Sequence, residues 1–410
     1  MTKYLFKFTP VEPYFFGNEK TLAKYPEYDG KKNEQNDAAA KKTDGQSNAP
    51  TADTASIQSL YFASSEDTPS QSTILGAIRL MLLLDNGRSL TDFNAYTKAE
   101  KDLIGPKSFK PDEHDTEFGC IKSISPLFII DGNDQAFIPM PRDHVFSDKN
   151  ENYTPFGEYK AMRCAEGEKL YPTEYDPKTA GWYTFVSTNG GCIKDMISSE
   201  VRVGIKRKTQ DKGFFKRRFK KLNKDYSFAV ICELNCTVDE DGMFRNAGTH
   251  PDQAFSDWPV RKTAFLGRAR SPFAVEIYQT DMDIEALSQQ LLDTKHKATR
   301  YPSAECTLVY CLSDAFVLPE KKYENVLFAA TETRDHRSLS TGEKNGMLYK
   351  RKDLSVMHRL LKAGSVLVFE NEKTAACWIK NNTDGRESAK NIGYNSFITV
   401  PKKEENKEEE

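Results

Sequence analysis

Apolar and polar side chains alternate at the start of the chain, where Tyr4, Phe6 and Phe8 share one face and lysines lie on the other. This period of two predicts a strand over residues 3–9 with one buried face. The prolines that follow, at positions 10 and 13, end the strand.

The segment from Asp29 to Ser56 has a different composition, because none of its residues is more apolar than alanine. Such a sequence cannot bury enough surface to offset the entropy lost on ordering. We therefore expect a disordered insertion over residues 29–56.

A helix is predicted after residue 69, because a Pro-Ser-Gln-Ser sequence offers capping groups and Ile74, Ile78 and Leu82 recur at helical spacing before Asn86-Gly87. Residues 121–146 then read as a strand pair around a turn at Asp131–Asn133.

The second half of the sequence repeats the order of strand, helix and strand. A long strand is predicted over 226–238, a helix near 283–293 and a strand over 306–312. Shorter strands follow at 326–331, 365–370 and 396–400. This order favours an α+β fold, in which antiparallel sheets carry helices on one face.

The bulk charge says little about partners, because 58 Lys and Arg residues stand against 60 Asp and Glu residues in 410. The start of the chain lacks the apolar core of a signal peptide. No apolar run approaches the roughly 18 residues that span a bilayer. We therefore expect a cytoplasmic protein with no membrane partner.

Sequence templates for catalysis and metal binding are missing. There is no phosphate-binding loop, no H-E-x-x-H, no G-x-S-x-G and no C-x-x-C. The six histidines are scattered, and Cys232 and Cys236 share the apolar face of a strand, where buried thiols behave as small hydrophobic groups. We predict no catalytic residue, no metal site and no cofactor.

Positive charge gathers in one window. Residues 202–224 hold eleven Lys and Arg residues against the single acid Asp211, with Phe214, Phe215 and Phe219 among them. Basic side chains neutralise phosphates, and aromatic rings stack on unpaired bases, so the window is typical of an RNA-binding surface. A solvated run of charge is the alternative. Three successive basic residues at 216–218 do not suit a buried strand, which favours a protruding hairpin or loop.

The start of the helix is a second candidate for RNA contact. Free backbone N–H groups near Ser72 and Thr73 suit a phosphate, Gly76 allows close approach of a backbone, and Arg79 lies one turn onward. An ordinary capped core helix with an incidental glycine explains the same residues.

Taken in order, five sequence stretches resemble the family of third subunits of Cmr (type III-B) CRISPR complexes, a Cas-five-like group of the RAMP superfamily. The five stretches are Pro13–Gly17, Pro69–Arg79, Ser125–Phe128 with Pro139–Asp143, Arg202–Ile205 with Lys212–Phe215, and Leu361–Glu370 followed by Asn391–Asn395. The sequence departs from the family at Leu266–Arg270, where a glycine and an acid are missing, and in the insertion.

The resemblance implies two ferredoxin-like (RRM-like) domains, with a protruding basic hairpin, that bind the 5′ repeat-derived handle of the crRNA. We place the first domain at 1–225, with the hairpin at 202–224, the second at 226–400 and a disordered charged tail at 401–410. The implied partners are the large polymerase-like subunit, the adjacent RAMP backbone subunit and, indirectly, target RNA. The expected RNA-binding residues are Ser72, Thr73, Gly76, Arg79, Arg202, Gly204, Ile205, Lys206, Arg207, Lys208, Lys212, Phe214, Phe215, Lys216, Arg217, Arg218, Arg268 and Arg270.

Three other readings stay open. A RAMP endoribonuclease that processes precursor crRNA would need a His or Tyr general base near the first strand and helix, whereas the first histidine is His114. A purely structural subunit would not need the basic window. The sibling subunit of type III-A complexes differs from the Cmr family only in its end motifs.

Overall fold

The computed structural model describes most of the chain. The described residues are 2–17, 61–88, 95–111, 114, 116–147, 152–164, 167–177, 185–193, 196–206, 213–238, 244–246, 260–267, 270–296, 306–337, 341–344, 347–350 and 357–401. The insertion predicted over residues 29–56 lies outside them, as do all but the first residue of the predicted tail.

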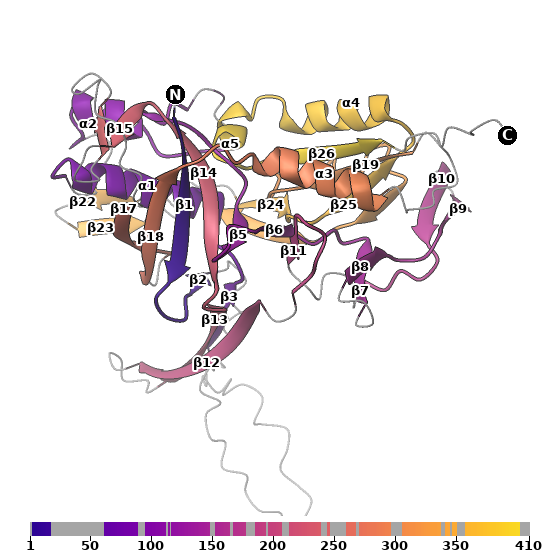
Figure 1. The fold of residues 1–410 in the computed structure, drawn as a ribbon, viewed down its shortest axis with the longest axis horizontal. Helices are drawn as coiled ribbons and strands as arrows, with labels where there is room; N and C mark the ends of the chain where they lie inside the picture. The colour runs from indigo at the N-terminus through magenta and orange to yellow at the C-terminus, as the bar shows by residue number, and fades with distance from the viewer. Residues whose placement is uncertain are drawn as a thin grey trace, which may run out of the picture.

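The largest sheet has eight strands, and every pairing within it is antiparallel. Its first strand lies between two strands from much later in the chain, with Phe6 opposite Val230 on one side and Ile277 on the other (Figure 1). In spatial order the strands are β11 (Phe185–Ser187), β6 (Ala136–Pro139), β5 (Phe128–Asp131), β14 (Tyr226–Leu234), β1 (Thr2–Pro10), β18 (Ser271–Gln279) and β17 (Val260–Leu266), and β4 (Ile121–Ile124) also pairs with β14.

Both faces of this sheet are buried. Tyr4, Phe6 and Phe8 form one core with helix α1 (Gln71–Asp85), as the alternation in the sequence predicts. Leu5 points to the opposite face and joins a second core with helix α3 (Ile284–His296). The sheet is therefore the middle layer between α1 and the C-terminal half.

The C-terminal half contains a four-stranded antiparallel sheet and helix α4 (Glu372–Thr383). Leu308 faces the core shared with α3, whereas Val309 faces a separate core with Trp378 of α4. The two helices therefore cover opposite faces (Figure 1). The strands are β20 (Phe328–Ala330), β25 (Val366–Phe369), β19 (Thr307–Cys311) and β26 (Phe397–Pro401).

A third sheet projects from the lower edge of the molecule in Figure 1. It contains β12 (Ile197–Lys206), β13 (Gly213–Leu222), β3 (Tyr61–Glu66) and β2 (Phe16–Gly17), and β13 pairs with β3 in parallel. The remaining elements are short: α2 (Lys98–Ile104), α5 (Glu387–Asn391), and the strand pairs β7 (His144–Ser147) with β8 (Asn152–Pro155), β9 (Tyr159–Cys164) with β10 (Gly167–Pro172), β15 (Cys236–Val238) with β16 (Phe244–Asn246), β21 (Thr333–Arg337) with β24 (Met357–Leu361), and β22 (Thr341–Lys344) with β23 (Met347–Lys350).

The structure has an α+β fold with mostly antiparallel sheets, as the sequence predicts. The strand predicted over residues 226–238 is interrupted, because the register shifts after Glu233 and the N–H of Asn235 donates to the carbonyl oxygen of Cys120. Cys232 and Cys236 are buried, as their shared parity predicts.

The placement of two domains at 1–225 and 226–400 stays a prediction. The boundary between residues 225 and 226 would separate β1 from β14, although the two strands pair over seven residues of each. It would also separate β1 from β18, which pair from Tyr4 to Pro10.

Candidate nucleic-acid interface

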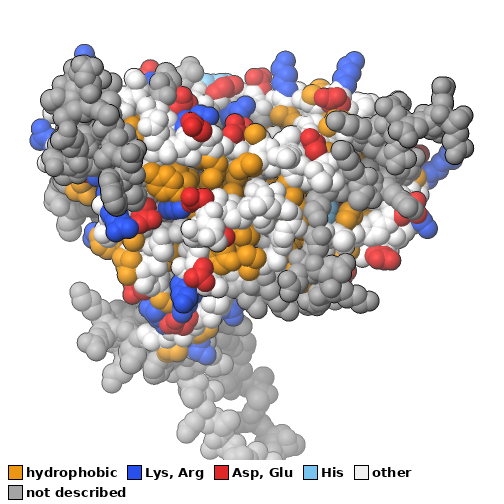
Figure 2. Space-filling model, viewed as in Figure 1, with side chains coloured by type: hydrophobic (Ala, Val, Ile, Leu, Met, Phe, Trp, Pro, Cys, Tyr) orange, Lys and Arg blue, Asp and Glu red, His pale blue; other side chains and the backbone are white. Residues whose placement is uncertain are grey.

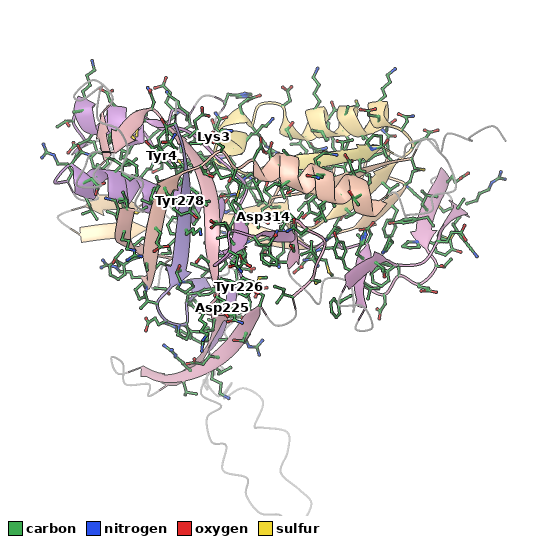
Figure 3. All side chains as sticks on the ribbon, viewed as in Figure 1. Lys3, Tyr4, Asp225, Tyr226, Tyr278 and Asp314 are labelled. Atoms are coloured by element: carbon green, nitrogen blue, oxygen red, sulfur yellow. The ribbon has the colours of Figure 1, made fainter. Side chains whose placement is uncertain are left out.

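The basic window forms an antiparallel hairpin, in which β12 and β13 pair from Ile197 opposite Leu222 to Lys206 opposite Gly213. A turn at its base leads through Asp225 and Tyr226 into β14, at the lower end of the main sheet (Figure 3). The predicted protruding hairpin is therefore present, and β13 connects it to the body through β3.

The outward face of the hairpin combines aliphatic and basic side chains. Val201 is 50% exposed and pairs with Arg218, and Val203 is 61% exposed and pairs with Lys216. Lys216 and Arg218 are exposed as well. In Figure 2 blue and orange side chains lie together at the lower end of the molecule, with red ones among them.

The opposite face of the hairpin packs on the Pro13–Gly17 stretch. The ring of Phe219 lies 5.4 Å from that of Phe15, and the guanidinium of Arg217 lies 5.8 Å from the Phe15 ring. Arg202 lies 4.7 Å from the Phe219 ring, and its Nε donates to Glu200 at 2.7 Å. Cation–π contacts orient guanidinium groups without neutralising them. Glu200 offsets one positive charge on this face.

The base of the hairpin is fixed by Tyr14 and Asp67. The backbone N–H of Tyr14 donates to the carbonyl oxygen of Lys220 at 2.8 Å, and the Lys220 N–H donates back at 3.0 Å. The Lys220 ammonium pairs with Asp67 at 2.6 Å, and the Tyr14 hydroxyl donates to the Asp67 carbonyl. The hairpin is thereby tied to the segment that leads into α1.

The loop between β17 and β18 lies against the same stretch. Gly267 has φ +70°, and a Cβ there would come 3.0 Å from the Phe15 carbonyl oxygen, so a larger residue would be strained and crowded. Ser271 accepts a hydrogen bond from the Phe15 N–H at 3.1 Å. Arg270 is exposed, 5.3 Å from the ring of Phe265, which is itself 48% exposed. The β17–β18 loop, through Gly267 and Ser271, and the hairpin, through Phe219, therefore both contact Phe15.

The start of α1 offers less than the sequence suggests. The Thr73 N–H donates to the Ser70 side chain, and the Ser72 N–H donates to the Tyr394 hydroxyl at 3.3 Å. The backbone N–H groups of Ser72 and Thr73, which the sequence suggests for binding a phosphate, therefore already have acceptors within the protein. Gly76 is exposed and has open space around the position of a Cβ.

Arg79 does not reach the surface. It is 5% exposed, its Nη2 donates to the carbonyl oxygen of Lys107, and it lies 5.3 Å from the Phe118 ring. Burial lowers the pKa of its guanidinium to about 10. The RNA contact predicted for Arg79 is therefore replaced by a structural one, because a helix pattern does not reveal which side chains later loops cover.

The other predicted residues are only partly described. Gly204 is half-buried and pairs with Phe215. The backbones of Ile205, Lys206, Phe214 and Phe215 lie in the hairpin strands, and their side chains are outside the description. Arg207, Lys208, Lys212 and Arg268 fall outside the described residues.

Two aromatic residues of this region were not predicted from the sequence: Phe15, a buried ring that supports the hairpin, and Phe265, which is exposed beside Arg270. Phe15 lies in the Pro13–Gly17 stretch, which indicates the family resemblance but not a contact with the hairpin. Phe265 lies between Ala264 and Leu266, which are buried, so its position on the outer face follows from strand alternation. An aromatic residue on the solvent face of an edge strand is the signal that could have revealed it.

None of the described helices is long and apolar enough to cross a membrane. Within the same part of the chain no three His, Cys, Asp or Glu side chains gather closely enough to hold a metal ion.

Residues 60–178 match the model of a family described as CRISPR-associated protein (Cas_Cmr3). The matched segment contains two of the five motif stretches, and the match confirms the resemblance found in them. No curated protein matches the chain.

Solved structures align over most of the chain at low similarity. A chain of the type III-B Cmr-beta complex bound to cognate target RNA has TM-score 0.41 and 13% identity, covering 96% of each chain. A chain of that complex with target RNA and AMPPnP has TM-score 0.41 and 14% identity, covering 97% of this chain and 99% of that one. A chain of a Csm3–Csm4 subcomplex of the type III-A interference complex has TM-score 0.24 and 12% identity, covering 60% and 76%.

Proposed function

Since residues 60–178 match the Cas_Cmr3 family, we propose that this chain is a non-catalytic, RNA-binding subunit of a type III-B CRISPR interference complex. In this proposal it holds the 5′ repeat-derived handle of the crRNA and bridges the large polymerase-like subunit to the adjacent RAMP backbone subunit. Contact with target RNA is indirect. The finer fold, two ferredoxin-like domains, belongs to the same proposal.

The observation that carries the proposal is the projecting hairpin. Lys216 and Arg218 extend from its outward face beside Val201 and Val203, where they can neutralise phosphates while the aliphatic groups contact sugars or bases. Arg217, Phe219 and Phe15 on the opposite face hold the hairpin in a fixed orientation. A solvated charge run would not need this support.

The test is the salt dependence of binding to single-stranded RNA. Each phosphate contact on a single strand adds about 0.7 to the slope of log affinity against log salt. The variant K216A/R218A should therefore flatten the slope by about 1.4. The Phe15 ring orients the Arg217 guanidinium without neutralising it, so replacing Arg217 with Ala as well should bring the total change to about 2. Binding should weaken for every RNA sequence, since phosphate contacts carry no sequence information.

The matched control is K373A/K380A, which removes two exposed positive charges from α4. This control should leave the slope unchanged. An unchanged slope in K216A/R218A, with the variant still assembling with its partner subunits, would show that the hairpin does not contact RNA.

A further inference from the structure

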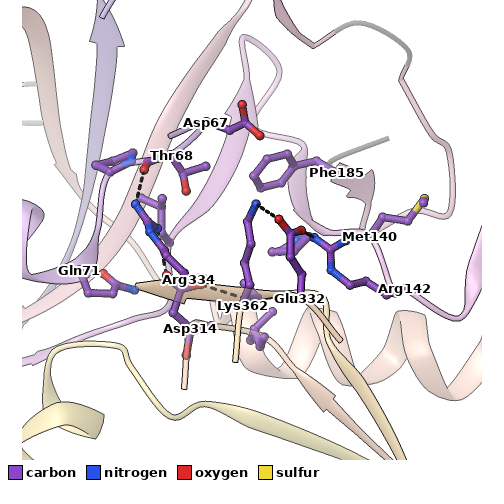
Figure 4. Close-up of a pocket in the computed structure, with 16 residues that line it drawn as sticks. Asp67, Thr68, Gln71, Met140, Arg142, Phe185, Asp314, Glu332, Arg334 and Lys362 are labelled. Atoms are coloured by element: carbon purple, nitrogen blue, oxygen red, sulfur yellow. Dashed lines mark hydrogen bonds and ion pairs between the residues drawn. The ribbon is translucent and has the colours of Figure 1, made fainter. Parts of the chain in front are cut away.

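A pocket of about 200 Å³ opens between the start of α1 and the C-terminal half (Figure 4). Asp67 and Gln71 line it from the α1 side, and Arg142 lines it from the segment after β6. Arg334 and Lys362 come from β21 and from the turn before β25. Asp314, which belongs to the same lining, lies in the middle of the molecule (Figure 3).

One side of the pocket carries a surplus of positive charge. Arg142 and Lys362 both pair with Glu332, Lys362 at 3.4 Å, so two cations share one carboxylate. The Nε of Arg142 is buried and has no hydrogen-bond partner. A buried donor without a partner is costly, so this side of the pocket favours an anionic ligand.

The adjacent wall is rigid. Arg334 pairs with Asp314 at 2.9 Å and donates to the carbonyl oxygen of Thr68 at 2.9 Å. Burial alone would lower the pKa of Arg334, but Asp314 and Glu66 raise it above the ordinary value, so the guanidinium stays charged. Asp314 also accepts from the Ala363 N–H at 2.9 Å. The pocket is therefore preorganised before any ligand enters.

The side-chain amide of Gln71 is held in one orientation, with its oxygen Oε1 available as a hydrogen-bond acceptor. Its Nε2 donates to the carbonyl oxygens of Ser125 and Gly393, each at 3.1 Å. Because both neighbours can only accept, the amide cannot be flipped, and Oε1 must serve another donor. Gln71 is 4% exposed and its Oε1 has no partner.

The size of the pocket limits the ligand. A cavity of about 150 Å³ accepts benzene, so about 200 Å³ holds the ring of a base, and the attached sugar and phosphate must lie at the opening of the pocket. The ring must carry an N–H for Gln71, and an attached anion must reach Arg142 and Lys362. A nucleobase with its phosphate has both groups, whereas a carboxylate side chain would leave the Gln71 acceptor without a donor.

We propose that this pocket takes one nucleotide unit, with its base toward Gln71 and its phosphate at Arg142 and Lys362. The pocket adjoins the hairpin, because Asp67 lines the pocket and also pairs with Lys220 of β13. A base that leaves the stack of a bound single strand can therefore enter it. This inference rests on the proposed function, since the strand that delivers the base is the RNA held by the hairpin.

The test compares the unmodified protein with a variant in which a larger side chain fills the pocket. Each protein is tested with RNAs that lack the base of one nucleotide at a time. Ala363 lines the pocket and its backbone contact to Asp314 survives substitution, so Ala363→Met fills the space without removing a polar group. The RNA is the single strand that co-purifies with the protein, with each nucleotide replaced in turn by an abasic one. An abasic nucleotide at one position should lower the affinity of the RNA for the unmodified protein about tenfold. In A363M the abasic nucleotide at the same position should lower the affinity less than about twofold.

Two further variants complete the test. Ala376→Met on the exposed face of α4 is the matched control and should keep the full tenfold loss. Lys362→Met keeps the space open but removes the phosphate contact, so it should weaken binding of every RNA about fivefold and retain the position-specific loss. Melting curves of all variants confirm that they are folded.

The proposal is overturned if no abasic position lowers the affinity for the unmodified protein. It is also overturned if the same position lowers the affinity for A363M by the same factor. If the hairpin variant K216A/R218A also leaves binding unchanged, the proposed function fails with it; if that variant weakens binding, only the pocket assignment fails. Titration with AMP, GMP, CMP and UMP identifies the source of the nucleotide. A different outcome is that a mononucleotide raises the melting temperature of the unmodified protein but not of A363M, while no abasic position in the RNA lowers affinity. That result would assign the pocket to a free nucleotide instead of RNA.

Discussion

The side-chain amide of Gln71 donates a hydrogen bond of 3.1 Å to the carbonyl oxygen of Gly393, which ties the first turn of α1 to a turn near the C-terminus. Gly393 has φ +87°, and a Cβ there would lie 2.5 Å from the Gln71 Nε2, so only glycine fits. Two stretches that are 322 residues apart therefore meet through backbone geometry and one side chain.

We expect Gln71→Ala to destabilise the protein by about 2 kcal/mol, because two buried carbonyl oxygens, those of Ser125 and Gly393, lose their donor. Urea denaturation measures this loss. Gln290→Ala on the exposed face of α3 is the control and should change stability by less than about 0.5 kcal/mol. Equal stability of the two variants would mean that the tie contributes nothing.

The ion pair of Asp314 and Arg334 is mostly shielded from solvent, with side chains 10% and 11% exposed. Asp314→Asn should cost about 3–5 kcal/mol, because Arg334 would remain buried without its counterion. Arg261→Ala breaks a pair whose arginine is 78% exposed and should cost less than about 1 kcal/mol. Chemical denaturation of both variants compares the two pairs, and a small loss for Asp314→Asn would contradict the prediction.

His336 should make stability depend on pH. Burial, together with Arg334 and His358, lowers the pKa of His336 from 6.5 to about 4. Between these values the unfolded chain binds a proton that the folded protein does not, so stability is full above about pH 6.5 and falls as the pH drops toward 4. The contribution amounts to about 3 kcal/mol.

Denaturation midpoints measured at pH 5 and pH 7 test this dependence. His336→Gln should reduce the difference between the two midpoints, whereas His114→Gln, at a histidine side chain that is 70% exposed, should leave it unchanged. An undiminished difference in His336→Gln would assign the pH dependence to other groups.

We predict that the purified protein does not cleave precursor crRNA, with or without divalent metal. A general base must reach the 2′-hydroxyl, and His144 and His336 are buried. Labelled RNA incubated with the protein should stay intact. Specific cleavage that disappears in His114→Ala or His358→Ala would make the chain an endoribonuclease.

Much of the local structure follows from the sequence. The spacing of Ile74, Ile78 and Leu82 predicts α1, and these three side chains are buried in the core. The alternation of Tyr4, Phe6 and Phe8 predicts β1 and its buried face. The density of charge in residues 216–218 predicts a projecting hairpin, because three successive basic side chains cannot all avoid a buried face.

The tertiary structure alone decided which distant groups meet. Periodicity shows that Arg79 follows one turn after Leu75, but not that Phe118 and the carbonyl oxygen of Lys107 cover its guanidinium. It shows that Phe265 faces outward, but not that Arg270 lies beside it. Local sequence sets the face of a strand or helix, whereas register between segments more than 200 residues apart depends on the whole core. The pocket between Gln71 and Lys362 is therefore a property of the assembled fold and has no signature in either segment.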